Sequence, residues 1–208
     1  MEKQQMKTEL GKILTKVGAL KFGVFTLTSG EISSYYLDLR IVPSFPEAFK
    51  HICDLYVELI KTEVGTDNFD RIAGIPTAGI SFGAMAAYSL KKPFVYVRTA
   101  ERKHGRGRRV EGILSPGDRV LLIDDLITKG GSIINAADSV RAEGGIVTDA
   151  VVLLNREENG TQNLADVEIK LHYMLTTYEL AQEMYKRDAI TEEQLKTVSK
   201  QIKEKQNR

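Results

Sequence analysis

Residues 120–132 read Val120-Leu121-Leu122-Ile123-Asp124-Asp125-Leu126-Ile127-Thr128-Lys129-Gly130-Gly131-Ser132, an apolar run that ends in two carboxylates and a polar, glycine-rich turn. The apolar run predicts a buried strand, and open α/β sheets bind ligands at the carboxyl ends of their strands. The turn can direct successive backbone N–H groups at a phosphate, assisted by the start of the following helix. Carboxylates accept hydrogen bonds from sugar hydroxyls, so the stretch suits a sugar phosphate.

Apolar runs alternate with helical patterns on both sides of this stretch. Strands are expected at 71–75, 94–98, 120–124, 146–154 and 167–174, and helices at about 80–90, at 132–142 and from 176 onward. Gly144-Gly145 is typical of a helix C-cap that leads into the next strand. The alternation predicts an α/β fold with a mostly parallel sheet that is covered by helices on both faces.

The amino-terminal part predicts a small hood beside this sheet, at about residues 20–42. An amphipathic helix comes first, and two β-prone runs at 24–28 and 32–39 then form a hairpin pattern, interrupted at Ser29-Gly30. Ser44 and Glu47 have the spacing of a capping box and predict that a helix opens there. The tail, residues 199–208, is polar without apolar periodicity, so we expect it to be disordered.

Composition indicates one soluble domain. The chain has 208 residues, of which 42% are hydrophobic, enough for one substantial core. Its 29 basic and 28 acidic side chains give a net charge of +1, which provides no general attraction to nucleic acid or to anionic membranes. The single cysteine, Cys53, excludes an internal disulfide and fits a reducing compartment. Without an apolar stretch long enough to span a bilayer, or a signal-peptide pattern, we expect a cytoplasmic protein.

Two further segments are candidates for binding. The loop at 74–80 contains Pro76, Thr77, Ala78 and Gly79 between an expected strand and an expected helix, so its backbone could meet an anion, although an ordinary turn explains it equally well. The second candidate is the loop at 98–112, which is rich in arginine and also contains lysine and histidine. A solvated charged loop or a nucleic-acid patch would also be basic, but the segment has no aromatic residues for base stacking. Its length favours a lid over the site.

The 120–132 stretch resembles the phosphoribosyl-diphosphate (PRPP) signature of the type I phosphoribosyltransferases, in which two acidic residues precede a Thr-x-Gly-Gly/Thr-Ser/Thr turn. The resemblance implies that Asp124 and Asp125 bind the ribose 2′- and 3′-hydroxyls and that residues 128–132 wrap the 5′-phosphate. It also implies a diphosphate-binding role for residues 76–79. A Walker-type nucleotide site would need a Gly-x-x-x-x-Gly-Lys-Ser/Thr loop, which the sequence lacks. A receiver-type site would have its acidic pair nearer the amino terminus.

Within these enzymes, the basic loop is similar to that of the orotate phosphoribosyltransferases, which typically shows Arg-Lys-x-x-Lys-x-His-Gly. Arg98, His104 and Gly105 agree with that pattern, whereas Thr99 and Arg102 stand where it has lysines. Arginine presents a planar fork in place of a compact ammonium, so the exchange is not neutral. The resemblance therefore implies that either Arg102 or the adjacent Lys103 acts as the catalytic cation.

The resemblance extends to the base. Residues 25–30 and the aromatic pair Tyr35-Tyr36 look like the hood that borders the base, with Thr28 in place of the usual lysine. Arg156 matches an arginine that contacts orotate, and the resemblance also implies that Thr128, Tyr35 and Tyr36 bind orotate. Without the resemblance, Arg156 would be read as an ordinary surface ion-pair partner.

The resemblance implies transfer of ribosyl 5-phosphate from PRPP to N1 of orotate, with Mg²⁺ carried mainly by PRPP and no protein residue assigned as its ligand. It also implies a homodimer whose basic lid reaches the neighbouring site. The predicted catalytic residues are Lys103, Arg102, Asp124 and Asp125, and the predicted PRPP contacts are Arg98, Arg102, Lys103, His104 and residues 124–132. A phosphoribosyltransferase for another base and a PRPP-sensing regulator are the alternatives.

Overall fold

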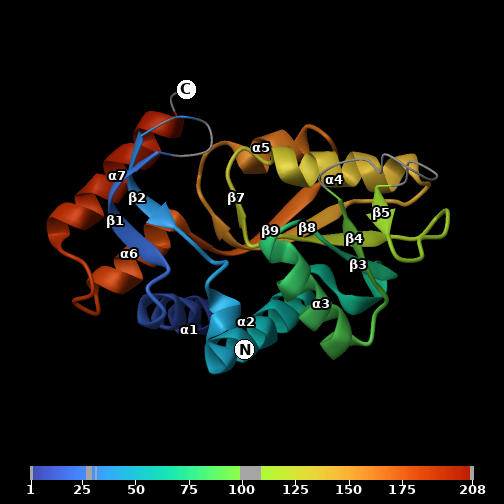
Figure 1. The fold of residues 1–208 in the computed structure, drawn as a ribbon, viewed down its shortest axis with the longest axis horizontal. Coiled ribbons are helices and arrows are strands. Elements are labelled where there is room, and N and C mark those ends of the chain that lie inside the picture. The colour runs from blue at the N-terminus through green and yellow to red at the C-terminus, as the bar shows by residue number, and fades with distance from the viewer. Residues whose placement is uncertain (1, 27–29, 31, 99–108, 207–208) are drawn as a thin grey trace.

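A mixed sheet lies between two layers of helices in the computed structural model, which describes residues 2–26, 30, 32–98 and 109–206 (Figure 1). The helices are α1 (Lys3–Lys16), α2 (Pro46–Leu59), α3 (Ala78–Leu90), α4 (Gly131–Ala142), α5 (Gly160–Ala165), α6 (Thr177–Tyr185) and α7 (Glu192–Gln206). The strands are β1 (Leu20–Thr26), β2 (Ile32–Leu37), β3 (Arg71–Gly74), β4 (Phe94–Val97), β5 (Val110–Glu111), β6 (Val120–Ile123), β7 (Leu126–Ile127), β8 (Asp149–Asn155) and β9 (Lys170–Thr176). The predicted α/β architecture is confirmed.

The main sheet runs in the order β5-β4-β3-β6-β8, with β7 and β9 also paired to β8. Every pairing in it is parallel except that of β4 with β5. The carboxyl ends of β3, β6 and β8 therefore meet at one edge, where the segments after them can form a common site. The short edge strand β5 lies within the segment that the sequence predicted as a continuous loop.

The acidic doublet interrupts a strand. Both β6 and β7 pair with β8, Leu122 opposite Ala150 and Leu126 opposite Leu154, so the pairing register is the same before and after the interruption. The carbonyl of Asp125 accepts hydrogen bonds from the backbone N–H groups of Leu153 and Leu154, at 3.0 and 3.2 Å. The strand predicted to reach residue 124 thus ends at Ile123, and β8 holds the doublet at a fixed height on the sheet.

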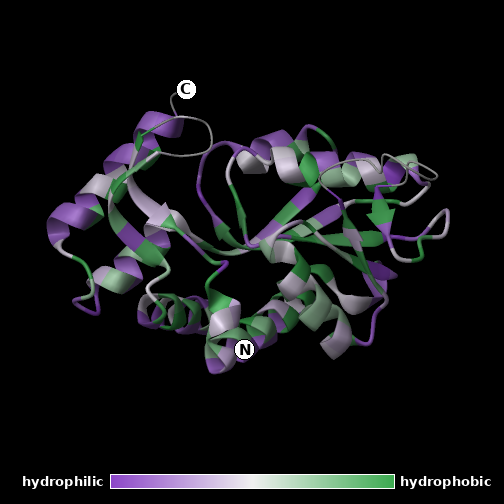
Figure 2. Cartoon of the chain, viewed as in Figure 1, coloured by the Kyte–Doolittle hydropathy of each residue, from purple (hydrophilic) through white to green (hydrophobic). Residues whose placement is uncertain are grey.

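Each face of the sheet has its own apolar core. Leu121 and Ile123 pack in the cluster that contains buried residues of α2 and α3, whereas Val120 and Leu122 pack in the cluster with α4. This alternation is what a strand covered on both faces requires. Hydrophobic residues accordingly concentrate in the strands, while the outer helices, α7 among them, carry many hydrophilic residues (Figure 2). Cys53 is buried in the first cluster.

The hood is a two-stranded antiparallel sheet, β1 with β2, beside the main sheet (Figure 1). Its register shifts between Phe22 and Phe25. The predicted hairpin is confirmed, although β1 begins at Leu20 and ends at Thr26.

Two local predictions are wrong. The tail is the last part of α7, which continues to Gln206 with Ile202 buried in the core. The capping box is not formed, because α2 begins at Pro46 after Phe45, and Ser44 instead ends a short 3-10 helix, with no side-chain cap found among the described residues. None of the helices in the described part of the chain is long and apolar enough to cross a membrane.

Candidate active site

The acidic doublet lies at the carboxyl end of β6 and is largely removed from solvent. Asp124 is 8% exposed. Its Oδ1 accepts a hydrogen bond from the backbone N–H of Asp125, and Asp125 Oδ1 accepts one from Leu126 N–H, both at 2.9 Å. The Tyr56 hydroxyl, from α2, donates to the Asp124 carbonyl at 2.6 Å. The backbone of the doublet is therefore held from two elements, which fixes where its carboxylates stand.

Burial sets the charge state of the doublet. Burial, and then the neighbouring charge of Asp125, raises the pKa of Asp124 well above its ordinary value. Burial also raises the pKa of Asp125, while the hydrogen bond from Asp124 and the charge of Arg40 act in the opposite direction. The pair therefore retains a proton more readily than exposed carboxyls do, and Asp124 is the member that favours holding it. Hydroxyl donors or a nearby cation would favour full ionisation.

The turn at 128–132 leads from the doublet into α4. Gly130 has a φ of +86°, which favours glycine, and a Cβ there would lie 2.4 Å from Leu164 Cδ1, so a larger residue would also displace that side chain. Gly131 and Ser132 form the exposed first turn of the 12-residue helix α4. The N–H groups of a helix's first turn have no partner within the helix, so this exposed turn offers donors to an anion.

Helix α5 supports this turn from behind. A Cβ on Gly160 would lie 2.3 Å from the carbonyl oxygen of Thr128, and Asn163 Nδ2 donates to the carbonyl of Lys129 at 2.8 Å. Within the turn, Lys129 is exposed and Thr128 is half-buried.

The loop at 76–79 packs against the doublet. It follows β3 and contains a cis peptide bond between Pro76 and Thr77. A Cβ on Gly79 would lie 2.4 Å from the Ile123 carbonyl oxygen and 3.1 Å from Asp124 Oδ1. The start of α3 and the end of β6 therefore meet at one edge of the sheet. This contact with the doublet favours the binding-loop interpretation over that of an ordinary turn.

Arg156 and the hood tyrosines form a third group, which we call the base region (Tyr35, Tyr36 and Arg156). Arg156 is 5% exposed and its Cζ lies 5.5 Å from the centroid of the Tyr35 ring. Its Nε lies 3.1 Å from Glu158 Oε1 without the alignment of a hydrogen bond, and its Nη2 has no hydrogen-bond partner among the described residues. The reading of Arg156 as a surface ion-pair partner is therefore wrong. A buried guanidinium with free donors can bind an anion.

The tyrosines of the base region are held in different ways. Burial raises the pKa of Tyr35, and the charge and hydrogen bond of Arg156 act against that shift. Tyr36 stacks on Phe25 with ring centroids 5.5 Å apart, and its hydroxyl accepts from Arg40 Nη2 at 2.5 Å. The hood thus presents one buried and one partly exposed aromatic ring.

The structure describes only the two ends of the basic loop, Arg98 and residues 109–112. Arg98 is described, and its Nη1 lies 3.0 Å from Glu111 Oε1 across the pairing of β4 with β5. Arg102, Lys103 and His104 lie outside the described residues, as does Thr28 of the hood. The ends of the loop are therefore anchored at an edge of the sheet.

Sequence reasoning missed two residues at the site. Arg40, just after the hood, also bonds Asp38 through Nε at 2.8 Å, and its charge reaches Asp125. Tyr56 lies on α2, and its contact with the doublet joins residues 68 positions apart. The sequence offered one indication of this contact: a tyrosine on an apolar helix face, whose hydroxyl needs a hydrogen-bond partner once it is buried.

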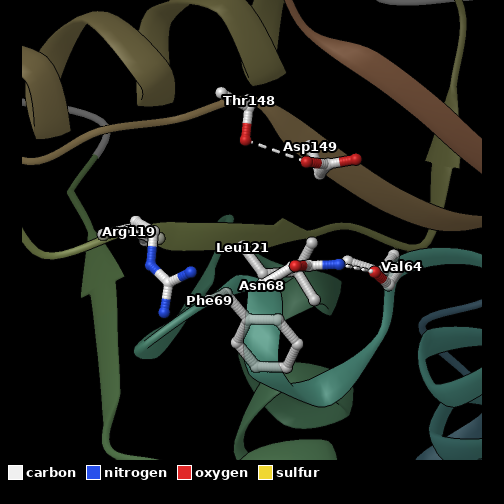
Figure 3. A pocket seen from close by; sticks show the side chains of 8 residues that line it. Val64, Asn68, Phe69, Arg119, Leu121, Thr148 and Asp149 are labelled. Carbon is white, nitrogen blue, oxygen red and sulfur yellow. Dashed lines mark hydrogen bonds between the residues drawn. The ribbon is translucent and has the colours of Figure 1, made fainter.

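A small pocket lies outside the doublet, the turn at 128–132 and the base region (Figure 3). It lies at the amino ends of β6 and β8, the far end of the sheet from the doublet, and its lining includes Phe69, Arg119 and Asp149. Two hydrogen bonds are drawn there, from Thr148 Oγ1 to Asp149 Oδ2 at 2.9 Å and from Asn68 Nδ2 to the Val64 carbonyl at 2.6 Å (Figure 3). The Arg119 guanidinium donates to Asp70, at 2.8 Å from Nη2 to Oδ1.

Comparisons with known proteins agree with this arrangement. Residues 43–171 match the model of the phosphoribosyl transferase domain. An orotate phosphoribosyltransferase of Cenarchaeum symbiosum is 46% identical over 168 residues, which cover 81% of this chain and 84% of that relative. The crystal structure of orotate phosphoribosyltransferase from Aeropyrum pernix matches with a TM-score of 0.76 at 32% identity, over 84% of this chain and 97% of that one. Leishmania donovani UMP synthase matches with a TM-score of 0.85 at 28% identity, over 95% of this chain but 42% of that longer one. This chain therefore belongs to the phosphoribosyltransferases and, among them, to the orotate phosphoribosyltransferase family.

Proposed function

We propose that this chain transfers the ribosyl 5-phosphate group of PRPP to N1 of orotate, giving orotidine 5′-monophosphate and diphosphate in pyrimidine synthesis. The bond from C1 to the diphosphate oxygen breaks, and the bond from C1 to N1 forms. One observation carries the substrate assignment: the buried guanidinium of Arg156 has free donors and faces the Tyr35 ring, a setting suited to a flat anionic base. The doublet and the turn at 128–132 suit the sugar phosphate.

The doublet orients the ribose in this proposal. Hydroxyl groups on C2 and C3 would donate to Asp124 and Asp125, and these hydrogen bonds would favour ionised carboxylates against the rise in pKa that burial causes. As the diphosphate departs, positive charge develops on the ribose ring, and ionised carboxylates below it lower the energy of that state. The carboxylates therefore both place the sugar and assist the bond cleavage.

Phosphate groups are assigned to two backbone segments. The turn at 128–132 and the start of α4 bind the 5′-phosphate, and residues 76–79 bind the diphosphate beside the doublet. Arg98 and the basic residues of the loop, Arg102, Lys103 and His104, offset the charge that the leaving diphosphate develops.

Magnesium fits this site as an ion carried by the substrate. Among the described residues there is no cluster of three or more histidine, cysteine, aspartate or glutamate side chains that could hold a metal alone. The buried doublet offers carboxylate oxygens, the ligand type that Mg²⁺ prefers, and PRPP oxygens would supply the rest. When bound, the ion would offset diphosphate charge.

We also propose a homodimer in which the basic loop reaches the neighbouring site, and a cytoplasmic location, which the free, buried Cys53 fits.

A panel of bases tests the proposal. With PRPP and Mg²⁺ present, we expect diphosphate release with orotate, and at most about a hundredth of that rate with uracil or guanine, because uracil lacks the carboxylate that Arg156 would pair. The measurement is diphosphate release coupled to a colorimetric assay. Release with guanine or uracil and none with orotate would assign the chain to another base. PRPP binding without turnover of any base would favour a regulator.

Separate alanine variants of Arg102 and Lys103 identify the loop cation. We expect one of the two to lower kcat by about 100-fold or more, in line with the loss of a group that stabilises developing charge, while the other changes it less than about fivefold. Orotate consumption under saturating PRPP is the readout. Exposed Lys91, at the carboxyl end of α3, provides the matched control when changed to alanine. Equal and negligible losses for both loop variants would contradict the catalytic role of the loop.

A further inference from the structure

We propose that α7 is a positioning element for the base region, acting through Lys205 on Arg156 and through Gln201 on Tyr35. This inference rests on the proposed use of orotate. Helix α7 lies against the hood strand β2 and against α6 (Figure 1). Val198 and Ile202 anchor it in the core. The polar side chains beside these anchors reach the two groups that are assigned to the base.

The first connection is a buried chain of charges. Lys205 Nζ donates to Glu158 Oε1 at 3.2 Å, and the same oxygen lies 3.1 Å from Arg156 Nε. The Glu158 side chain is 7% exposed and that of Lys205 is 13% exposed, so solvent screens these charges weakly. Glu158 therefore holds the Nε side of the guanidinium, and Nη2 is left for a ligand.

Lys205 adds positive charge beside Glu158. It shares the Glu158 carboxylate with Arg156, so part of that negative charge is offset by Lys205 and more of the guanidinium charge is left for an anionic base. Without Lys205, less of the Glu158 charge would be offset on its side away from Arg156. The neighbouring Glu157 also carries charge, but its Oε2 accepts from Tyr178 N–H in the first turn of α6, at 3.2 Å. The start of α6 thereby stabilises the Glu157 carboxylate, whose charge also reaches Tyr35.

The second connection reaches the aromatic side of the base region. Gln201 Nε2 donates to Ser33 Oγ at 2.6 Å, and Gln201 Oε1 accepts from Ser34 N–H at 3.0 Å. Ser33 Oγ in turn donates to the carbonyl of Tyr35 at 2.6 Å. Ser33 and Tyr35 are both fully buried, so Gln201 fixes β2 where Tyr35 faces Arg156.

Steady-state kinetics of Lys205→Met test the first connection. Methionine keeps the apolar stem of the side chain and removes its charge, so we expect the fold to be retained. We expect the KM for orotate to rise about tenfold, the effect of losing about one charge-assisted hydrogen bond, with kcat and the KM for PRPP within about twofold of wild type. Lys205→Arg should restore the orotate KM, since it restores the charge. Lys203→Met is the matched control, an exposed lysine on the same helix, and should leave all constants unchanged.

Gln201→Leu tests the second connection and keeps the inference open to refutation if Lys205→Met does not fold. We expect a rise in the orotate KM of about fivefold with an unchanged PRPP KM, because two hydrogen bonds that hold the hood are lost. Parallel rises in both KM values, or a fall in kcat alone, would show that α7 only stabilises the fold and would overturn the inference. An unchanged orotate KM in both variants would overturn it as well. Failure of the wild-type enzyme to use orotate would instead refute the proposed function, and the inference with it.

Discussion

Asp124→Asn is expected to lower kcat/KM for PRPP by about 100-fold or more, equivalent to about 3 kcal/mol of transition-state stabilisation. Asparagine preserves the size of the side chain and an oxygen that can accept from the Asp125 N–H, but it cannot offset the positive charge that develops on the ribose. It also offers one acceptor oxygen in place of two. Initial rates at varied PRPP, with orotate saturating, measure the loss.

The same substitution is expected to stabilise the free protein at neutral pH. Because the folded pKa of Asp124 is raised above its ordinary value of 3.8, ionisation is harder in the folded state than in the unfolded state. The contribution of this carboxyl to stability is therefore fully present below about pH 4 and is lost as pH rises through the folded pKa. An uncharged amide does not undergo this loss, so the thermal unfolding midpoint of the variant should exceed that of wild type at pH 7, with the difference shrinking toward pH 4.

Asp138→Asn is the control for both measurements, because it makes the same chemical change at an exposed position on α4. It should alter neither kcat/KM nor the pH dependence of the unfolding midpoint. If the Asp124→Asn variant lost activity and was also less stable than wild type at pH 7, the carboxylate would stabilise the fold. The expectation that its buried charge destabilises the free protein would then be wrong.

The sequence predicted the parts of the site that are local in the chain. The doublet, the turn at 128–132 and the start of α4 follow one another within 13 residues, so the strand, the glycines and the helix pattern were all visible together. The predicted parallel sheet also brought the loop at 76–79 to the same edge. What remained open was whether that loop touched the doublet, because the approach depends on how closely α3 packs on the end of β6.

The remaining features depend on contacts between distant segments. Glu158 and Lys205 are 47 positions apart, and Gln201 and Ser33 are 168 apart, so no window of sequence contains either pair. The disordered-tail prediction failed for a related reason. Residues 199–208 hold one apolar side chain that the structure buries, Ile202, and its helical spacing from Val198 is visible only when the window begins before residue 199. Composition alone therefore made a packed helix resemble a frayed end.

Gly79→Ala is expected to lower kcat/KM for PRPP by about tenfold or more without removing any functional group. The new Cβ would lie 2.4 Å from the Ile123 carbonyl oxygen and 2.9 Å from Asp124 Cα, and both of these are backbone atoms that cannot rotate away. The start of α3 must then move from the end of β6, which costs roughly 1–3 kcal/mol and separates the diphosphate loop from the doublet. Initial rates at varied PRPP and a thermal unfolding curve measure the two consequences.

Gly83→Ala, one turn further along α3, separates these consequences. A Cβ there would lie 3.1 Å from the Phe94 ring and 3.2 Å from Gly74 Cα, a milder overlap that lies away from the doublet. It should lower the unfolding midpoint less than Gly79→Ala and leave the PRPP kinetics near wild type. If Gly79→Ala destabilised the protein but kept the wild-type kcat/KM for PRPP, the close approach of α3 to β6 would serve only packing, and the diphosphate would bind elsewhere than at residues 76–79.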